Sequence, residues 1–146
     1  MILNIVAAIL FTFGMSIDII QKREQLYCGA QNIYHESRGE SSWGQIAVAN
    51  VVRNRVTSEH YPNTICEVVW QRKQFSWTDD DISDEPQNRK ALLKAVWFNL
   101  ISSMMDKSKG ATHYYAHNKV DPFWAKVMVV TTVIGNHTFG YIPNGK

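Results

Sequence analysis

Two carboxylates, Glu36 and Glu40, stand four residues apart in the stretch 34–45, and they are the residues best suited to chemistry. A carboxylic acid can protonate a leaving oxygen when an apolar environment raises its pKa. Two such groups at the mouth between two helices would form a site of a common kind. The plainer interpretation is that both glutamates are solvated charges at helix ends, as most glutamates are.

Two helices are predicted to hold these carboxylates. Ala30, Ile33 and Tyr34 recur at helical spacing, so Glu36 should lie near the C-terminus of a helix over about 26–36. Gly39 is predicted to end that helix in a left-handed conformation. The apolar run that follows predicts a second helix over 42–56, with Ser41 or Ser42 as its N-cap.

Other chemistries fit the same stretch less well. The metalloprotease pattern that His35-Glu36 suggests requires a second histidine at position 39, where the chain has Gly39. Ser37 and Cys66 lack the Gly-x-Ser-x-Gly context of an activated nucleophile. We therefore expect neither a metal ion nor a cofactor.

Further blocks follow in a fixed order along the chain. They are Gly-Gln-Ile-Ala-Val-Ala-Asn-Val-Val-Arg-Asn-Arg-Val (44–56), Tyr-Pro-Asn-Thr-Ile-Cys-Glu-Val-Val (61–69), Gln-Phe-Ser-Trp-Thr (74–78), Gly-Ala-Thr-His-Tyr (110–114) and Ile-Gly-Asn-His-Thr-Phe (134–139). With 34–45, these blocks resemble the cell wall hydrolases related to spore cortex-lytic enzymes, over residues 26–139. Gly140 departs from the pattern, which has an aromatic residue after Phe139, and this puts one cleft-wall or core contact in doubt.

The resemblance implies an α+β, mainly helical fold like that of lysozymes and lytic transglycosylases, with a small antiparallel sheet. Glu36-Ser37 is similar to the Glu-Ser of lytic transglycosylases, whose glutamate acts as general acid and then as base. In that scheme the substrate's own C6 hydroxyl attacks and leaves a 1,6-anhydro sugar. Glu40 is a weaker catalytic candidate, because an ordinary glycosidase needs a second carboxylate. Its alternative role is to stabilise the N-terminus of the next helix.

The same resemblance implies that glycan strands of peptidoglycan are the substrate. Aromatic rings and polar side chains in the matching blocks would then line a saccharide cleft. The candidate substrate-binding residues are Tyr34, Gln45, Gln74, Ser76, Trp77, His113, Tyr114, Trp124 and His137. For each of them taken alone, core packing or simple surface exposure is the alternative. His113 and His137 could also bind a metal ion together with a carboxylate, although hydrogen bonding in the cleft is the simpler role.

Length and composition fit one globular domain. The chain has 146 residues, of which 45% are hydrophobic, enough to form a core. Its formal net charge of +2 is too small to indicate a nucleic-acid partner. The 12% of aromatic residues suits both a core and sugar stacking.

Residues 1–20 form a hydrophobic N-terminal segment that precedes the catalytic domain, assigned to 26–146. The run 2–17 contains no charged residue and resembles the apolar region of a signal peptide. A cleaved signal, a membrane anchor and a helix of the fold remain three alternatives. No basic residue precedes the run, and Lys22 and Arg23 follow it, which opposes simple export. We expect an exported or anchored protein of the periplasm or cell wall.

Two cysteines, Cys28 and Cys66, flank the two helices that carry the glutamates. In an exported protein a disulfide between them would join these helices around the site, whereas in the cytosol both would be buried thiols.

The remainder of the chain predicts short elements. A helix is expected over 64–71, an irregular segment or short strand over 74–77, and a helix from about 83 to 105 whose buried face includes Leu100 and is widened by Trp97 or Phe98. The acidic run 79–81 is expected to be a solvated turn or the source of a second carboxylate. Residues 111–119 are expected to be extended, and residues 122–125 to begin a helical turn or a cleft wall. A strand is expected over 127–134. Residues 135–136 should form a hairpin turn that leads into a second strand over 137–141.

Three classes of function compete. The leading one is a peptidoglycan-cleaving lytic transglycosylase or muramidase that cuts the MurNAc–GlcNAc bond, such as a phage endolysin. The second is a non-catalytic peptidoglycan-binding module, which would keep the aromatic rings but need no buried carboxylate. The third is a membrane-anchored lysis accessory protein, in which residues 1–20 matter most.

Overall fold

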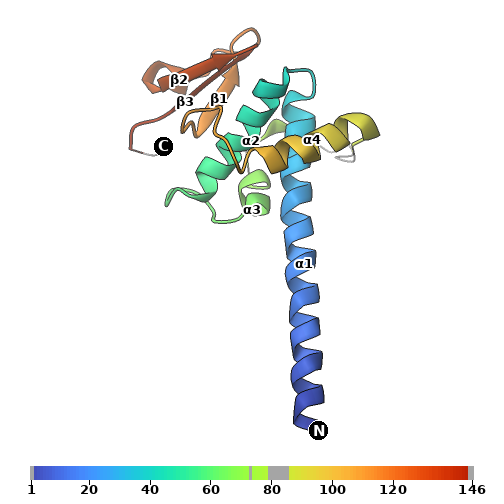
Figure 1. Cartoon of the computed structure of the whole chain (residues 1–146). Helices are drawn as coiled ribbons and strands as arrows, with labels where there is room; N and C mark the ends of the chain where they lie inside the picture. Colours follow the sequence, from blue (N-terminus) through green and yellow to red (C-terminus); the bar gives the residue numbers. More distant parts are fainter. Residues whose placement is uncertain (1, 73, 79–85, 145–146) are drawn as a thin grey trace.

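The structure is a computed structural model that describes residues 2–72, 74–78 and 86–144, with only the backbone course given for 2–16. Helix α1 (Ile2–Ser37) runs without a break from the apolar segment into the domain (Figure 1). The sequence predicted a helix only over 26–36. The polar residues 21–27 that link it to the apolar segment are also helical, because they include no proline and consist largely of good helix formers.

Helix α1 ends beside Glu36, in a tight turn where the Glu40 N–H donates to the Ser37 carbonyl at 2.8 Å. Gly39 lies in this turn, but it does not have the positive φ predicted for it. Helix α2 (Ser42–Val56) starts immediately afterwards, and its N-cap is Ser41, whose hydroxyl accepts from the Gly44 N–H. The predicted bounds of this helix are confirmed.

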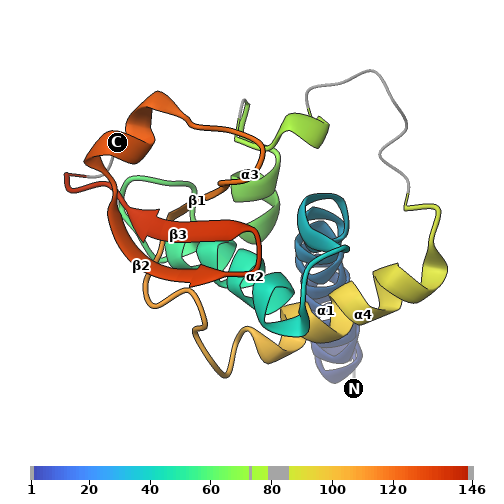
Figure 2. The same ribbon diagram turned by 90° about the horizontal axis from the view of Figure 1, so that it is seen from above.

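Helix α2 is the centre of the fold, because three groups of buried residues surround it. One group packs α2 against α1 and α4 (Arg89–Ile101), the second packs it against the sheet, and the third against α3 (Ile65–Val69) and the segment that follows. Figure 2 shows α2 between the sheet and the α1–α4 pair. The three groups are Ala30, Ile33, Tyr34, Ala49 and Ala95; Ala47, Val48, Val51, Ala111 and Phe139; and Val52, Val68, Val69, Phe75 and Trp77.

The sheet has three antiparallel strands in the order β1-β3-β2. They are β1 (His113–Ala116), β2 (Val129–Ile134) and β3 (His137–Tyr141), and the short 3-10 helix η2 (Phe123–Val127) precedes β2. The predicted hairpin turn at Gly135 is present, with a φ of 56° that favours glycine. The predicted mainly helical α+β fold with a small antiparallel sheet is confirmed.

The central strand β3 explains why position 140 is a glycine rather than the aromatic residue of the family pattern. A Cβ atom at this position would collide with the carbonyl oxygen of Val129 and with the side chain of Met128. The ladder between β2 and β3 also shifts register between Val130 and Thr132. No side chain fits here, so the aromatic residue of the family pattern has no place beside this irregular strand.

Helix α4 differs from its prediction at its start and on its outer face. Its N-cap is Asn88, so the helix begins three residues after Pro86, and the acidic residues at 79–81 and 83–85 lie outside the described residues. Ala95 is buried as predicted, but Trp97 and Leu100 are 61% and 46% exposed. Both side chains are therefore exposed to solvent, and the buried face of the helix does not include them, contrary to the prediction.

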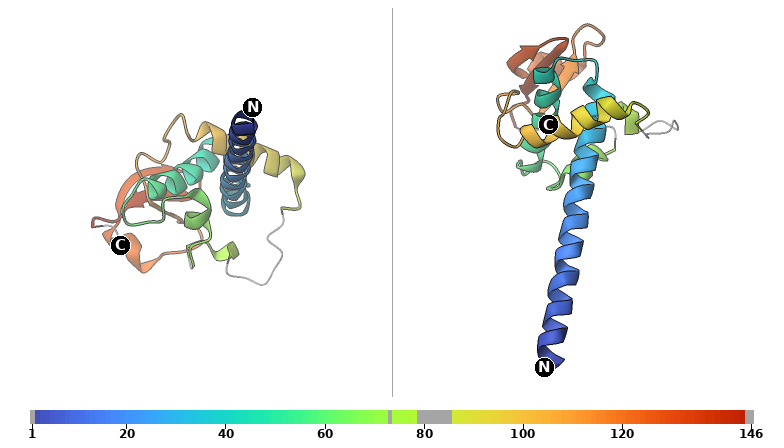
Figure 3. Two further views of the ribbon diagram at one scale, coloured as in Figure 1. Left: turned by 90° about the horizontal axis from the view of Figure 1, so that it is seen from below. Right: turned by 45° about the vertical axis from the view of Figure 1, so that its right-hand side comes forward.

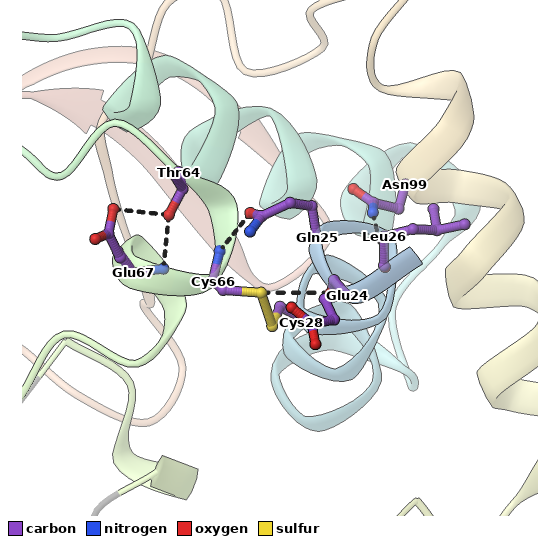
Figure 4. Close-up of a disulfide and its surroundings, with 8 residues drawn as sticks. All are labelled: Glu24, Gln25, Leu26, Cys28, Thr64, Cys66, Glu67 and Asn99. Atoms are coloured by element: carbon purple, nitrogen blue, oxygen red, sulfur yellow. Dashed lines mark hydrogen bonds between the residues drawn. A yellow bond between two sulfur atoms is a disulfide. The ribbon is translucent and has the colours of Figure 1, made fainter. Parts of the chain in front are cut away.

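The disulfide Cys28–Cys66 is present (Figure 4), but it joins α1 to α3 rather than α1 to the second helix as predicted, because Cys66 lies in α3. The side-chain oxygen of Gln25 accepts a hydrogen bond from the Cys66 N–H at 2.9 Å, so the same two helices are also tied through the backbone. Thr64 caps α3, which is shorter than the helix predicted over 64–71. Among the residues whose side chains are described, no helix is both long and apolar enough to cross a membrane.

Candidate active site

The carboxyl group of Glu36 lies where the last turn of α1 meets strand β1. The hydroxyl of Tyr114 donates a hydrogen bond to Glu36 Oε2 at 2.8 Å. Tyr114 is fixed in turn by ring contacts with His137 and Phe139 on the neighbouring strand. The carboxyl group is therefore held by a rigid partner, as a positioned acid requires.

Burial raises the pKa of Glu36 above its usual value, while the hydrogen bond from Tyr114 and the positive charge of Arg55 act in the opposite direction. Burial also raises the pKa of Tyr114 well above its ordinary value, so its hydroxyl stays protonated and can donate. A carboxyl group that retains its proton nearer to neutrality than usual is suited to protonate a leaving oxygen.

Arg55 is a component of the site that the sequence reasoning missed. It comes from the last turn of α2 and is only 5% exposed. Its Nε donates to the Thr112 carbonyl at 2.7 Å and its Nη1 to Gln74 Oε1 at 3.1 Å. The sequence held a signal for it, because Arg55 follows Val48 by seven residues and Val51 by four, which places it on the buried stripe of the helix.

Glu40 is bound by the turn between β2 and β3. Each of its two carboxylate oxygens accepts a hydrogen bond from Asn136, from the backbone N–H at 3.3 Å and from the side-chain amide at 3.2 Å. A Cβ at Gly135 would collide with the Glu40 carboxylate. Glu40 therefore holds the hairpin tip over the site, rather than the N-terminus of α2 as the alternative role supposed.

His137 lies next to this contact. Its Nδ1 is 3.9 Å from Glu40 Oε1 and is a buried atom without a hydrogen-bond partner. Burial lowers the pKa of His137, although the nearby Glu40 carboxylate acts in the opposite direction. The His137 ring also lines the hollow that contains Glu36 and Glu40, although its Nδ1 atom is buried behind that wall.

Glu36 lines one hollow, and its hydrogen-bond partner Tyr114 lines another. A hollow of about 380 Å³ is lined by Glu36, Glu40, Asn136 and His137, among others. A larger one of about 660 Å³ is lined by Tyr114, the hydrogen-bond partner of Glu36. The further polar and aromatic residues of the larger hollow include Arg55, Tyr61, Gln74, His113, Phe123 and Trp124.

The larger hollow has a largely aromatic wall beside the guanidinium of Arg55. Burial and the charge of Arg55 lower the pKa of His113 to about 4, so its ring is uncharged at neutral pH. The centre of that ring lies 5.4 Å from the ring of Trp124. Aromatic faces with a few convergent polar groups are typical of sites that bind neutral sugars.

Other candidate residues lie outside these two hollows. Tyr34 is 5% exposed and its hydroxyl accepts from the Asn88 N–H, while Trp77 is 8% exposed and donates to Asn32 Oδ1. His35 stacks on the Trp77 ring with 4.4 Å between ring centres, so this face is covered. Both rings are core residues that support the end of α1.

The two remaining candidates for substrate binding, Gln45 and Ser76, lie in places that the fold itself explains. Gln45 is 7% exposed and its amide donates to the Glu40 carbonyl at 3.0 Å, which fixes the turn before α2. Ser76 is exposed at the start of η1 (Ser76–Thr78). Within the described part of the chain, no three metal-binding side chains lie close enough to share an ion.

The chain is similar to proteins of known family. A family model described as Cell Wall Hydrolase matches residues 39–140, so Glu40 lies inside the matched stretch and Glu36 just before it. A spore cortex-lytic enzyme of Bacillus cereus is 32% identical over 113 residues, which cover 75% of this chain and 41% of that protein. A spore cortex-lytic enzyme of Bacillus subtilis is 31% identical, with 75% and 35% covered. The chain therefore spans about two fifths or less of the length of these relatives.

Two solved structures have the same fold. The crystal structure of the catalytic domain of the Bacillus cereus SleB protein superposes with a TM-score of 0.70 at 29% identity, over 81% of this chain and 90% of that one. The catalytic domain of the germination-specific lytic transglycosylase SleB from Bacillus anthracis gives 0.70 at 30% identity, over 80% and 93%. By the family model and by these relatives, the chain belongs to the cell wall hydrolase family.

Proposed function

We propose that this chain is a lytic transglycosylase that cleaves the MurNAc–GlcNAc bond of peptidoglycan, with Glu36 as its single acid and base. The observation that carries the proposal is the Glu36 carboxyl itself. It is desolvated, it accepts a hydrogen bond from Tyr114 at 2.8 Å, and it lines one hollow while Tyr114 lines a second. A glycan strand lying through both hollows would bring a glycosidic oxygen to this group.

The reaction follows from one carboxyl group. Protonated Glu36 donates its proton to the glycosidic oxygen while the bond from the muramic C1 to that oxygen breaks, and the released GlcNAc gains a hydroxyl. The Glu36 carboxylate then takes the proton of the C6 hydroxyl of the same muramic residue as its oxygen bonds to C1. The product is a 1,6-anhydro ring, no water is consumed, and Glu36 regains its proton.

A second mechanism has one observation in its favour. Glu40 lines the same hollow as Glu36, so a muramidase with two carboxylates would have its partner nearby. The hydrogen bonds of Glu40 to Asn136 favour a positioning role instead, because they already engage both carboxylate oxygens.

We place this activity outside the cytoplasm, in lysis of a bacterial wall by a phage or bacterial enzyme. The disulfide Cys28–Cys66 supports an oxidising compartment, where such bonds persist. The family and the catalytic-domain relatives support an enzyme rather than a binding module.

Purified peptidoglycan sacculi test the bond that is cut. Incubation with the full chain should solubilise sugar-containing fragments without creating new free amino groups. A rise in free amines in step with solubilisation would mean that peptide or amide bonds are cut, and the glycosidase proposal would be wrong. Bound but intact sacculi would indicate a binding module.

Replacing Tyr114 with Phe should shift the pH dependence of cleavage. The variant loses the hydrogen bond that lowers the pKa of Glu36, so that pKa rises and the acid form persists to higher pH. The alkaline limb of the kcat/KM profile should therefore move to higher pH, even though the maximum rate falls because the carboxyl is less firmly positioned. Tyr115→Phe, on the next residue of β1, is the matched control and should leave the limb in place; an unmoved limb in Tyr114→Phe would remove Tyr114 from the mechanism.

A further inference from the structure

Helix α4 carries a largely exposed apolar stripe, with Val96 at its edge packing against the buried group that joins α1, α2 and α4. Leu93, Val96, Trp97 and Leu100 recur at the spacing i, i+3, i+4 and i+7, which puts them on one helix face. Leu93 and Trp97 are each 61% exposed and Leu100 is 46% exposed. An exposed leucine is ordinary in itself, but a contiguous stripe with a tryptophan indicates a contact surface.

The stripe continues onto α1 at the point where α1 leaves the domain. Val96 lines a hollow of about 410 Å³ together with Ile20, Leu26 and Tyr27 of α1. Leu100 lines a second hollow of about 430 Å³ with Leu26, with Ile65 of α3, and with charged and polar residues that include Arg53 of α2. Ile20 and Tyr27 are themselves 54% and 41% exposed. We call the set Ile20, Tyr27, Leu93, Val96, Trp97 and Leu100 the basal patch.

The two helices that form the basal patch are fixed to each other. The Asn99 side chain donates to the Leu26 carbonyl at 3.1 Å, and Gly29 leaves the space that this side chain occupies. The disulfide holds the same part of α1 to α3 (Figure 4). The patch is therefore a preformed surface rather than an arrangement that partners must assemble.

The chain itself indicates what covers this surface. Helix α1 continues beyond the patch and projects away from the domain (Figures 1 and 3). The first charged residue of the sequence is Asp18, so residues 1–17 carry no charge at all. We propose that the basal patch lies against the headgroup region of a lipid bilayer that the N-terminal part of α1 enters. Tryptophan and tyrosine favour this depth, since their rings are apolar and their polar atoms remain hydrated.

This docking would fix the height of the active site above the lipid. Glu36 follows Ile17 by 19 residues on the same helix. At about 1.5 Å per residue, Glu36 would stand roughly 28 Å along the helix from Ile17, and roughly 14 Å from Tyr27 at the upper edge of the basal patch. Helix α1 would thus insert into the bilayer at its N-terminal end, hold the domain at a fixed distance from it, and carry Glu36 at its C-terminal end. The membrane contact does not depend on the reaction proposed for Glu36.

Tryptophan quenching tests the contact with the full chain. The protein is reconstituted into vesicles of phosphatidylethanolamine and phosphatidylglycerol, with or without brominated acyl chains, and its fluorescence is compared with that of two variants. Trp97→Phe removes the ring of the basal patch. Trp43→Phe is the matched control, because Trp43 is also exposed, at 52%, but lies at the start of α2 against Lys107.

Brominated lipid should quench the tryptophan fluorescence of the wild type and of the Trp43→Phe variant. The Trp97→Phe variant should show little of this quenching. Equal quenching in the wild type and Trp97→Phe would overturn the proposal. A second copy of the chain is the other candidate occupant. Light scattering in detergent tests this alternative. If the wild type is a dimer, Trp97→Asp is a monomer and brominated lipid does not quench the fluorescence, the basal patch is a contact between two copies of the chain and the membrane proposal is wrong.

Discussion

The variant Glu36→Gln should lose peptidoglycan cleavage while remaining folded. Gln cannot donate the proton that the leaving oxygen needs, and general acid catalysis alone is worth about 10²–10⁴-fold in rate. The loss should exceed that range, because the same group also acts as base in the second step. The measurement is the release of soluble muropeptides by equal amounts of the two proteins.

Stability separates a catalytic loss from an unfolded protein. Burial raises the pKa of Glu36 in the folded state, so its contribution to stability is fully present below the unfolded pKa and is lost as the pH rises through the folded pKa. Gln keeps the shape and stays neutral, and its oxygen can still accept from Tyr114. Glu36→Gln should therefore melt at or above the wild-type temperature at neutral pH, and its stability should depend less on pH.

Two further glutamates serve as comparisons for this variant. Glu59 is exposed after α2, and Glu59→Gln should cleave like the wild type. Glu40→Gln should retain substantial activity, or lose it together with stability because the turn contact to Asn136 weakens. A folded Glu40→Gln that is as inactive as Glu36→Gln would favour the mechanism with two carboxylates.

Opening the disulfide Cys28–Cys66 should destabilise the domain by about 4 kcal/mol. The bond links positions 38 residues apart, and constraining a loop of that length in the unfolded chain accounts for a value near this size. Domains of this kind have total stabilities of about 5–15 kcal/mol, so the loss would be a large fraction. Urea unfolding with and without reductant measures it.

The double variant Cys28→Ala/Cys66→Ser gives the control for this experiment. Its unfolding midpoint should match that of the reduced wild type and should not respond to reductant. Intact mass after alkylation without reduction should show no modified cysteine in the wild type. An unchanged urea midpoint on reduction would mean that the hydrogen bond between Cys66 and Gln25 and the packing of α3 hold the helices without the bond.

The sequence predicted those elements whose ends carry local signals. The second helix began where Ser41 can accept from the Gly44 N–H, and the hairpin turned at Gly135, where a positive φ is required. These features depend on neighbouring residues only, so they can be recognised from the chain. The lysozyme-like fold itself came from the resemblance of ordered motif blocks rather than from periodicity.

The sequence did not predict features that depend on distant partners. Whether an aromatic ring belongs to the cleft or to the core is decided by what packs on it, as His35 does on Trp77. The buried guanidinium of Arg55 is stabilised by Thr112 and Gln74, which are remote in the chain. The contact of Glu40 with the β2–β3 turn joins residues 96 positions apart, and no local pattern encodes it.

The most direct test of the account is mass analysis of the glycan ends released from purified peptidoglycan in water enriched in heavy oxygen. Intramolecular attack by the C6 hydroxyl consumes no water. The account predicts 1,6-anhydro-muramic ends, lighter than reducing ends by one water and free of the heavy isotope, and it predicts that they disappear with Glu36→Gln. Reducing muramic ends that carry the heavy oxygen would contradict the single-acid mechanism and identify a hydrolase.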